Sequence, residues 1–519
     1  ITVEGSGYRS NAIQEECEWV QINFGTHQTI TSTQVLMGTD INRGTFSTTF
    51  RIDTQAYGET WITAVGTDTG RLGTTIFFIT PEITRVAPLS GVVGRIITME
   101  GRGFYLDKDI YIRFGSDPSS DPDLQKLCDN HNGTFSVIFT ANTEPYGTKI
   151  ITAYNTSPFE IKATSTFVIL AKISNLEPTS GRVGQIVTVQ GTGFGTGTVR
   201  IDFGTKETIT TIIATANGTF STTFTVNTQY GGSQTITCYD LVNPQPSVTT
   251  VFNIRSNITS REPANGNVGQ VITVTGRGYI GTVSIHFGTH QTITSIAVST
   301  NGTFSTSFIA DEQPTGSRVI TCADTNSLDT TTFIIRAYII LVSPTTGRVG
   351  DPVTLQGTGF VGSETVRIQF GTHQTITTTQ ATPAGTFSVT FLVSTQPYST
   401  KWITAYSEGA PVADTSIFRI LPNIISLDPL QGSVSTFITI SGTGFETGTV
   451  YIHFGTHKTI TTTVGNGNGT FSLTFRVSTQ SWGTKTITAF TSATVFSTIN
   501  FIITSAYIIN LTPTDGSVS

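Results

Sequence analysis

The sequence predicts an all-β protein, a tandem array of six two-sheet β-sandwich domains that we expect to form an elongated rod. The first observation is a short segment of alternating apolar and polar residues, ending in Phe-Gly, that recurs six times. Its copies follow one another at intervals of 90, 89, 84, 83 and 84 residues, and this near-constant period indicates tandem repeats. The second observation is that no segment shows the apolar period of a helix. The six copies end at Phe24, Phe114, Phe203, Phe287, Phe370 and Phe454.

The Phe-Gly segment of the fifth copy has the pattern of a strand. Val366, Ile368 and Phe370 alternate with polar residues, which is the period of two of a half-buried β-strand. Gly371 then ends the strand, and a Thr-rich strand follows. We therefore expect the six phenylalanines to be equivalent buried residues, one in the core of each domain.

The other elements of a unit are clearest in the third copy. It opens with an apolar strand at 173–178, and a Val-Thr-Val strand at 187–189 leads into a Gly-rich turn at 191–194. After the Phe-Gly and Thr-rich strands, an Asn-Gly turn at 217–218 leads to another strand, and a hairpin near 230–232 precedes the last ones. About seven short strands separated by such turns are typical of a two-sheet sandwich.

The domain boundaries follow from an isoleucine that stands five residues before a proline at the start of each unit after the first. Almost no Gly/Ser/Pro linker precedes it, so we expect neighbouring domains to pack end to end. The expected domains are residues 1–82, 83–172, 173–256, 257–338, 339–422 and 423–506. The first of these lacks the opening strand, whereas residues 507–519 form an opening strand without a domain.

The third unit resembles the IPT/TIG family of immunoglobulin-like domains. The matching features lie at Pro178, 181–184, 187–189, 191–194 and 203–204. Because the Gly-x-Gly-aromatic element recurs in phase with Phe-Gly in all six units, the resemblance covers the whole chain. It implies a sandwich fold and, usually, an extracellular or ligand-binding architectural role without a catalytic residue. In some members such domains bind DNA or dimerise.

The composition argues against nucleic acid as a partner and against a membrane span in this segment. Only 12% of the residues are charged, the net charge is −6, and no basic patch is present. The longest apolar runs, such as residues 338–342, are far too short to cross a bilayer. The chain starts at Ile1 without a signal peptide, which indicates a processed or excised segment.

No arrangement of residues predicts an enzyme, and we expect neither a cofactor nor a metal. No Ser/His/Asp set, paired carboxylates or phosphate-binding glycine loop stands out. Four histidines follow Phe-Gly-Thr, but a domain built on ten-residue strands is roughly 35 Å long, so they lie too far apart to share an ion. We interpret them as polar turn residues. They are His27, His290, His373 and His457.

An acidic cluster in the first unit, Glu15, Glu16 and Glu18, suggests either a solvated loop or a weak cation site, and we favour the loop. The four cysteines fall one to a unit in the first four units, which excludes a disulfide within a domain. Cys238 and Cys322 stand where other units have alanine, so we interpret them as small buried residues. A disulfide between chains through the other two stays open. These are Cys17 and Cys128.

Seven Asn-x-Ser/Thr acceptors are candidate N-glycosylation sites, provided that the source secretes and glycosylates the protein. Four of them begin an Asn-Gly hairpin turn, which we expect to be exposed. The alternative is that asparagine serves the turn and threonine the following strand. The seven are Asn132, Asn155, Asn217, Asn257, Asn301, Asn468 and Asn510.

The two ends of the sequence complement each other. An unpaired sandwich edge and an orphan apolar strand are both unfavourable in water, and strand addition between copies would remove both. We therefore expect Ile508, Ile509, Leu511 and Pro513 to pack against Val3 and Ile22 of a neighbouring copy. A head-to-tail contact that does not close generates a filament. The alternative is that the segment is one period of a longer chain, with covalent continuity.

These observations predict a structural, non-enzymatic protein of an extracellular filament, sheath or stalk. Its expected main partner is a second copy of the same chain, bound head to tail. The alternative is a surface adhesin or carbohydrate-binding array, in which one atypical domain binds glycans or cell-surface components and the others are spacers. The first domain, with Trp19 and its insertions, is the candidate for that role.

Overall fold

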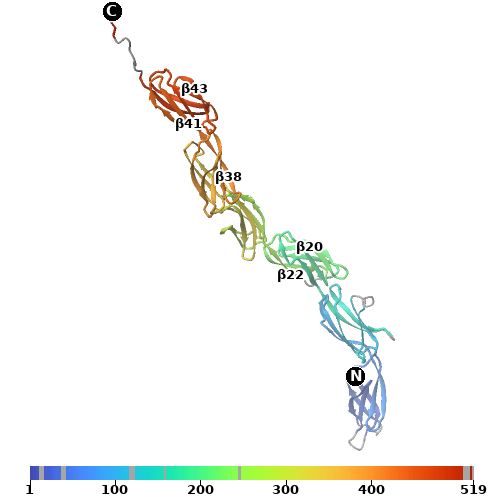
Figure 1. Ribbon diagram of the computed structural model, residues 1–519. Helices are drawn as coiled ribbons and strands as arrows, with labels where there is room; N and C mark the ends of the chain where they lie inside the picture. Colours follow the sequence, from blue (N-terminus) through green and yellow to red (C-terminus); the bar gives the residue numbers. More distant parts are fainter. Residues whose placement is uncertain are drawn as a thin grey trace. The chain divides into compact units, whose positions relative to one another are not determined.

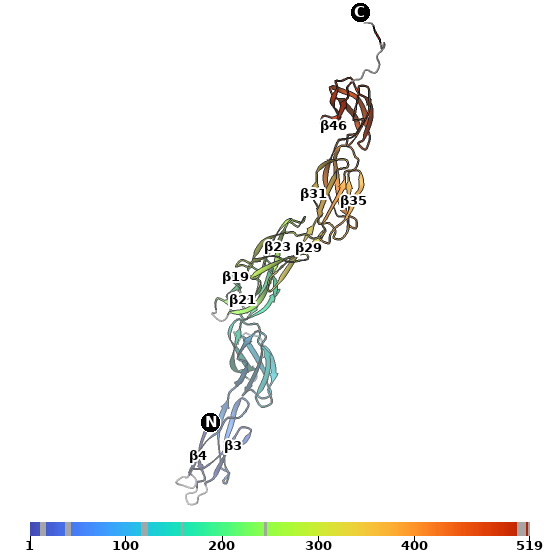
Figure 2. The same ribbon diagram turned by 90° about the vertical axis from the view of Figure 1, so that its left-hand side faces the viewer.

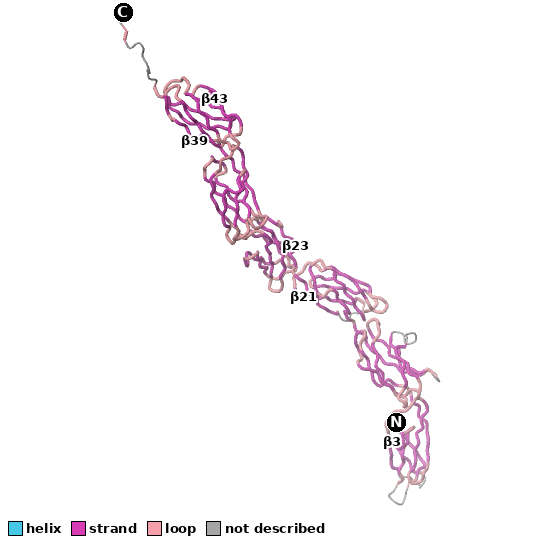
Figure 3. The backbone as a smooth tube through the Cα atoms, viewed as in Figure 1, coloured by secondary structure: helices cyan, strands magenta, loops and turns pink. Residues whose placement is uncertain are grey.

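The computed structural model describes residues 1–10, 17–36, 43–115, 123–156, 159–242, 247–505 and 515–516. Over these residues the protein is all-β, without a helix, as the fold class predicted from the sequence requires (Figure 3). The chain divides into two compact units, Ile1–Arg255 and Ser256–Ser519. The six domain boundaries inferred from the sequence stay predictions. The tail residues assigned to strand docking, and the acceptor Asn510, lie outside the described residues.

The first unit contains three repeats of strands (Figure 1). The first repeat has six: β1 Thr2–Tyr8, β2 Trp19–Phe24, β3 His27–Gln34, β4 Gly44–Thr49, β5 Gly58–Gly66 and β6 Leu72–Ile79. The second has eight: β7 Glu82–Ala87, β8 Ser90–Val92, β9 Ile96–Arg102, β10 Asp109–Gly115, β11 Asp123–Cys128, β12 Phe135–Thr140, β13 Gly147–Asn155 and β14 Ile161–Leu170. The third has β15 Lys172–Glu177, β16 Ser180–Arg182, β17 Ile186–Thr192, β18 Thr198–Phe203, β19 Lys206–Ile213, β20 Phe220–Thr225, β21 Gly232–Asp240 and β22 Val248–Arg255.

The second unit contains three further repeats, each with eight strands among the described residues. Some of these strands are labelled in Figure 2. The fourth repeat has β23 Asn257–Glu262, β24 Asn265–Gly266, β25 Val271–Arg277, β26 Thr282–Phe287, β27 His290–Ala297, β28 Phe304–Ile309, β29 Gly316–Ala323 and β30 Leu328–Ile335. The fifth has β31 Tyr338–Ser343, β32 Thr346–Arg348, β33 Pro352–Thr358, β34 Thr365–Phe370, β35 His373–Gln380, β36 Phe387–Leu392, β37 Ser399–Ser407 and β38 Ala413–Leu421. The sixth has β39 Asn423–Asp428, β40 Gln431–Gly432, β41 Phe437–Thr443, β42 Gly448–Phe454, β43 His457–Gly465, β44 Phe471–Arg476, β45 Gly483–Ser492 and β46 Val495–Ile503.

A complete repeat, such as the fifth, is a sandwich of a three-stranded and a five-stranded sheet. The three-stranded sheet has the order β31-β33-β36, and the five-stranded sheet has the order β32-β38-β37-β34-β35. All pairs are antiparallel except β32 with β38, which is parallel. The opening segment therefore contributes to both sheets, β31 beside β33 and β32 beside β38. Repeats two to six share this arrangement.

The first repeat lacks the two opening strands over the residues that the structure describes. Its sheets are reduced to β1-β4 and β3-β2-β5-β6, so one strand is missing from each. The outer edges of β1 and β6 correspond to the edges that β31 and β32 cover in the fifth repeat. Within the described residues, the edges of β1 and β6 are therefore not covered by an opening segment.

Each repeat has its own hydrophobic core between the two sheets. The inward residues of the Phe-Gly strand alternate with half-exposed ones, so that Val366, Ile368 and Phe370 of β34 are fully buried. The six phenylalanines expected to be equivalent are all 0% exposed, which confirms the strand register. A second ring packs on each of them, for example Phe391 at 5.5 Å and Phe418 at 5.7 Å between ring centroids from Phe370.

Candidate functional site

A groove lies on the first repeat where the other repeats have their opening strands. Its volume is about 440 Å³. Its lining consists of residues 3–8 of β1, residues 71–75 around the start of β6, and Phe46, Ile62 and Ala64 from the adjoining strands. The groove thus runs between the two strand edges that have lost their partners, and its floor is the apolar core.

Residue burial shows that the core of the first repeat is open at this groove. Val3 lies opposite Thr48 in β4, as Val189 lies opposite Thr222 in β20 of the third repeat. Val189 is fully buried, whereas Val3 is only half-buried. Because β15 covers β17 in the third repeat, the difference matches the loss of a covering strand.

The geometry of the groove suits β-strand addition. The outer edge of β1 presents main-chain donors and acceptors, and the groove offers pockets for alternate side chains. In the sixth repeat the opening strand β39 fills such a groove with Ile424 and Leu427, which are 8% and 6% exposed, whereas Ile425 between them is 56% exposed. A strand that fits the groove therefore needs apolar residues three positions apart.

Two observations bear on the predicted docking, which stays a prediction because the tail residues lie outside the described part of the chain. Ile22 is fully buried in β2 and does not line the groove, whereas Val3 does. Ile509 corresponds in sequence to Ile425, which is exposed, whereas Ile508 and Leu511 correspond to the buried Ile424 and Leu427. The sequence did not predict that Tyr8 and Ile62 line the groove. The two residues come from different sheets, and a contact between sheets leaves no local pattern in the sequence.

The histidines after Phe-Gly-Thr have local partners, and each begins the Thr-rich strand of its repeat. His27 pairs with Asp53, and His290 pairs with Asp311. In the last two repeats serine replaces the aspartate as the partner. The Nδ1–Oγ distances are 3.2 Å for His373 with Ser394 and 3.4 Å for His457 with Ser478. Each histidine thus joins two loops of its own repeat.

A buried glutamine explains why the Phe-Gly-Thr turn recurs. Nε2 of Gln396 donates to the Phe370 carbonyl at 3.1 Å, and its Oε1 accepts from the Thr372 N–H at 3.0 Å. Gly371 has a φ of +55°, and a Cβ there would lie 2.0 Å from Gln396 Oε1, so a side chain at this position would displace the Gln396 amide. The sequence signal is a glutamine 26 residues after the phenylalanine. It recurs as Gln229, Gln313 and Gln480.

Glu18 is a correction to the prediction of a solvated acidic loop. Its carboxylate is fully buried and accepts hydrogen bonds from the Arg9, Asp68 and Thr69 N–H groups at 3.0, 3.2 and 2.8 Å. Burial by itself raises the pKa of the Glu18 carboxyl, but these bonds and one from the Thr69 hydroxyl outweigh it, and the pKa is lowered. Glu18 therefore ties three loop segments together. Glu15 and Glu16 lie outside the described residues.

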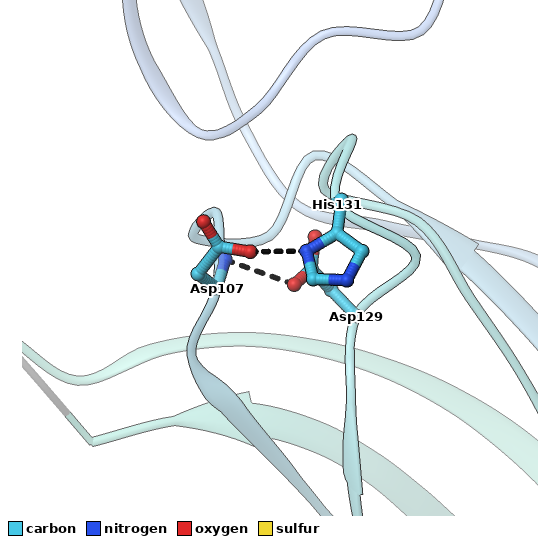
Figure 4. Close-up of side chains that lie close together, drawn as sticks. All are labelled: Asp107, Asp129 and His131. Carbon is cyan, nitrogen blue, oxygen red and sulfur yellow. Dashed lines mark hydrogen bonds and ion pairs between the residues drawn. The ribbon is translucent and has the colours of Figure 1, made fainter.

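One cluster with metal-binding side chains occurs among the described residues. Asp107, Asp129 and His131 of the second repeat each place a ligand atom within 4.8 Å of the others (Figure 4). However, the Asp129 oxygens accept from the N–H groups of Asp107 and Gly133, both at 2.9 Å, and Asp107 pairs with His131. The cluster therefore acts as a tie between two loops. Sequence analysis missed it because its members come from separate segments.

The cysteines behave largely as expected. Cys238 and Cys322 are fully buried, and burial raises the pKa of each thiol to about 12, which makes both unreactive. Cys17 is half-buried, and Cys128 is exposed. An interchain disulfide through either of these stays a prediction.

The glycosylation candidates separate into two groups. The Asn-Gly asparagines Asn132, Asn217, Asn301 and Asn468 have exposed side chains, and Asn257 is half-buried. Asn155, in contrast, is fully buried, and its Nδ2 donates to the Asp109 carbonyl at 2.7 Å. Because a glycan is attached through Nδ2, the folded chain does not present Asn155 for modification, and its glycosylation stays a prediction.

Comparisons with known proteins give no family assignment. No family model matches the chain, and no curated protein matches it. The IPT/TIG resemblance thus stays a resemblance. The described residues contain no helix that is long and apolar enough to span a membrane.

Solved structures with which the chain aligns include three bacterial or adhesion proteins. A Salmonella alpha-2-macroglobulin has 10% identity and a TM-score of 0.15 over 97% of this chain, which spans 45% of that protein. A tetra-tandem repeat from the extending region of a large adhesion protein has 11% identity, a TM-score of 0.20, and coverage of 66% and 98%. Invasin, a bacterial integrin-binding protein, has 16% identity, a TM-score of 0.20, and coverage of 69% and 82%. Similarity this low supports no conclusion about ligands or partners.

Proposed function

We propose that this chain is a non-enzymatic structural segment of an extracellular filament, sheath or stalk, extended by strand complementation between repeats. The observation that carries the proposal is the open groove of the first repeat, between the unpaired edges of β1 and β6. Residues 507–513 have the sequence of an opening strand, with Ile508 and Leu511 three positions apart like Ile424 and Leu427. Inserted into the groove of a second copy, such a strand restores the complete sandwich.

The same proposal has a covalent form, in which the opening strand comes from the preceding period of a longer chain. Both forms give an extended array of sandwiches, and they differ only in whether the donor strand belongs to the same polypeptide. The form with separate copies requires that the purified chain assembles by itself, which the experiment below measures.

The test is self-association of the full chain and of variants in the tail. Deletion of residues 507–519 is expected to leave the repeats folded and to abolish assembly, as measured by sedimentation and electron microscopy. A more specific test compares two full-length variants. One is the double variant Ile508→Asp/Leu511→Asp, and the other is the matched control Ile509→Asp. The double variant is expected to prevent assembly, because it buries two charges, and the control is expected to assemble. Assembly of the deletion variant would contradict strand complementation.

A second candidate function is that of a surface adhesin or carbohydrate-binding array. Its support is the set of exposed aromatic residues on the first repeat, where Trp19, Trp61 and Phe78 are at least half exposed. However, Trp402 occupies in the fifth repeat the position of Trp61 in the first, with 64% exposure. An aromatic surface is therefore not special to the first repeat. Binding of immobilised glycans that is lost on Trp19→Ala and kept on Trp402→Ala would favour this candidate.

A further inference from the structure

Consecutive repeats of the first unit are joined by a recurring main-chain hydrogen bond. The donor is the main-chain N–H of the residue directly before β5 or β13. The acceptor is the carbonyl of the aromatic residue in the Gly-x-Gly-aromatic element of the next repeat. Tyr57 N donates to the Phe104 carbonyl at 3.0 Å, and Tyr146 N donates to the Phe194 carbonyl at 3.0 Å. The Tyr57 ring also contacts the Tyr105 ring of the next repeat, at 4.9 Å between centroids.

The second unit contains the same joint twice. Thr315 N donates to the Phe360 carbonyl at 3.1 Å, and Tyr398 N donates to the Phe445 carbonyl at 3.2 Å. All four donor residues in the two units are half-buried. Because the bond uses only main-chain atoms, it tolerates the change from tyrosine to threonine. Its recurrence at four joints indicates that consecutive repeats contact each other in the same way.

One glycine at each joint permits the contact. It is the second glycine of the Gly-x-Gly-aromatic element, with φ between +68° and +75°. A Cβ on it would lie only 2.3–2.5 Å from a carbonyl oxygen at the end of the preceding repeat, too close for any side chain. These glycines are Gly103, Gly193, Gly359 and Gly444.

A second glycine, that of the Asn-Gly turn, packs against the hairpin loop that contains the donor residue of the preceding repeat. A Cβ on Gly218 would lie 2.5 Å from the Pro145 Cα, and one on Gly469 would lie 2.5 Å from the Pro397 Cα. The Asn-Gly turns of these repeats therefore lie against the preceding repeat, although the asparagine side chains are exposed. The recurring glycines of the sequence thus serve the joints as well as the turns.

The two halves of this joint also occur without a partner. On the first repeat, Gly7 has a positive φ like the joint glycines, of +90°, but nothing lies within 4 Å of a Cβ placed on it. On the sixth repeat, Trp482 takes the position of Tyr57 and Tyr398, directly before the strand at the last hairpin, and its side chain is 78% exposed. Gly7 and Trp482 match the occupied joints in their position within the repeat. The first repeat differs in conformation, because β1 continues through Tyr8 and the φ of Gly7 is larger than those of the four joint glycines.

We propose that Gly7 and Tyr8 of the first repeat dock on the loop containing Ser481 and Trp482 of the sixth repeat in a second copy of this chain. The Trp482 N–H then donates to the Tyr8 carbonyl, as Tyr398 donates to Phe445. The open space at Gly7 receives the end of β46, and the exposed Trp482 ring becomes covered. This joint rests on the proposed head-to-tail assembly. It shares Gly7 and Tyr8 with the end of the strand groove and adds the loop of Trp482, which does not line the groove.

The test compares two glycine variants in the full-length chain. Gly7→Val is expected to weaken self-association by about tenfold or more, because the added side chain occupies the docking space. Gly94→Val is the matched control, since Gly94 has a φ of +81° and equally open surroundings, so valine introduces the same backbone strain. Circular dichroism checks that both variants stay folded. Equal association of the two variants would overturn the joint.

Two tryptophan substitutions test the surface of the sixth repeat that takes part in the proposed joint. Trp482→Ala is expected to weaken self-association by about tenfold, as truncation of a central aromatic residue does in other interfaces. Trp402→Ala removes a similarly exposed ring away from the joint and is expected to leave association unchanged. Equal effects of the two substitutions, or none at Trp482, would overturn the proposal.

A synthetic peptide of residues 507–519 separates the joint from strand complementation. Its binding to the full chain, measured by fluorescence anisotropy, is expected to be the same for the wild type and for Trp482→Ala, because Trp482 does not line the groove. If the peptide does not bind, strand complementation fails, and a selective loss of association in Trp482→Ala still supports the joint. If the peptide binds and Trp482→Ala associates normally, the joint alone is wrong. A full chain that stays monomeric overturns both as contacts between copies.

Discussion

The first and third repeats have the same strand register around the core and differ in what covers it. In the third repeat β15 and β16 pair with both sheets, and Val189 is fully buried. In the first repeat the corresponding edges are open, and Val3 is half-buried. The difference shows that the register of the remaining strands does not depend on the opening segment, and that the opening segment covers the edge of the core.

The largest expected effect is a loss of stability when the central phenylalanine of a core is removed. It is expected both in the complete repeats and in the first repeat, which lacks the opening strands. Replacement of Phe370 or of Phe24 by Ala should destabilise its own repeat by about 3–5 kcal/mol, because each ring is fully buried. Hydrogen exchange of the strands in the affected repeat measures the loss. A cost near zero at Phe24 would mean that the first repeat is not a folded sandwich without its opening strand.

The next effect tests the difference itself, with one substitution made at two equivalent positions. Val189→Ala should cost about 2–3 kcal/mol, whereas Val3→Ala should cost about 1 kcal/mol, because Val3 is already partly in contact with water. Hydrogen exchange again gives both values. Adding the peptide of residues 507–519 should raise the cost at Val3 toward that at Val189. If the two costs are equal without the peptide, the open edge has no energetic meaning.

Most of the fold could be predicted from the sequence, because each strand carries its own alternation and each turn its own glycine. The register of β34 and the missing opening strand of the first repeat follow from such local patterns. The Gln396 tie, the buried Glu18 and the Asp107–His131 pair could not be predicted in the same way. Their partners lie in distant segments, and a polar residue that will be buried looks the same in sequence as one that will be solvated.

A smaller effect concerns Glu18, which helps to hold the open repeat together. Since its pKa is lowered in the folded chain, Glu18 stabilises the first repeat at neutral pH, and this contribution is lost as the pH falls through the folded pKa. Glu18→Gln should therefore destabilise the repeat by about 2–3 kcal/mol at pH 7 and by less in acid. Hydrogen exchange of β2 and β5 at several pH values measures this. An unchanged difference between pH 7 and pH 3 would contradict the buried, ionised state of Glu18.

The smallest effect separates the second repeat from the others at its Asn-Gly turn, where His131 pairs with Asp107. The hydrogen bond and charge of Asp107 raise the pKa of His131. The pair is thus present below the ordinary histidine pKa and is lost as the pH rises through the raised value. Because the ring is exposed, we expect a shift in titration rather than a large change in stability. Asp107→Asn should lower the His131 pKa in an NMR titration, whereas Asp351→Asn, in the fifth repeat, should not. An unchanged pKa in Asp107→Asn would show that the two side chains do not pair in solution.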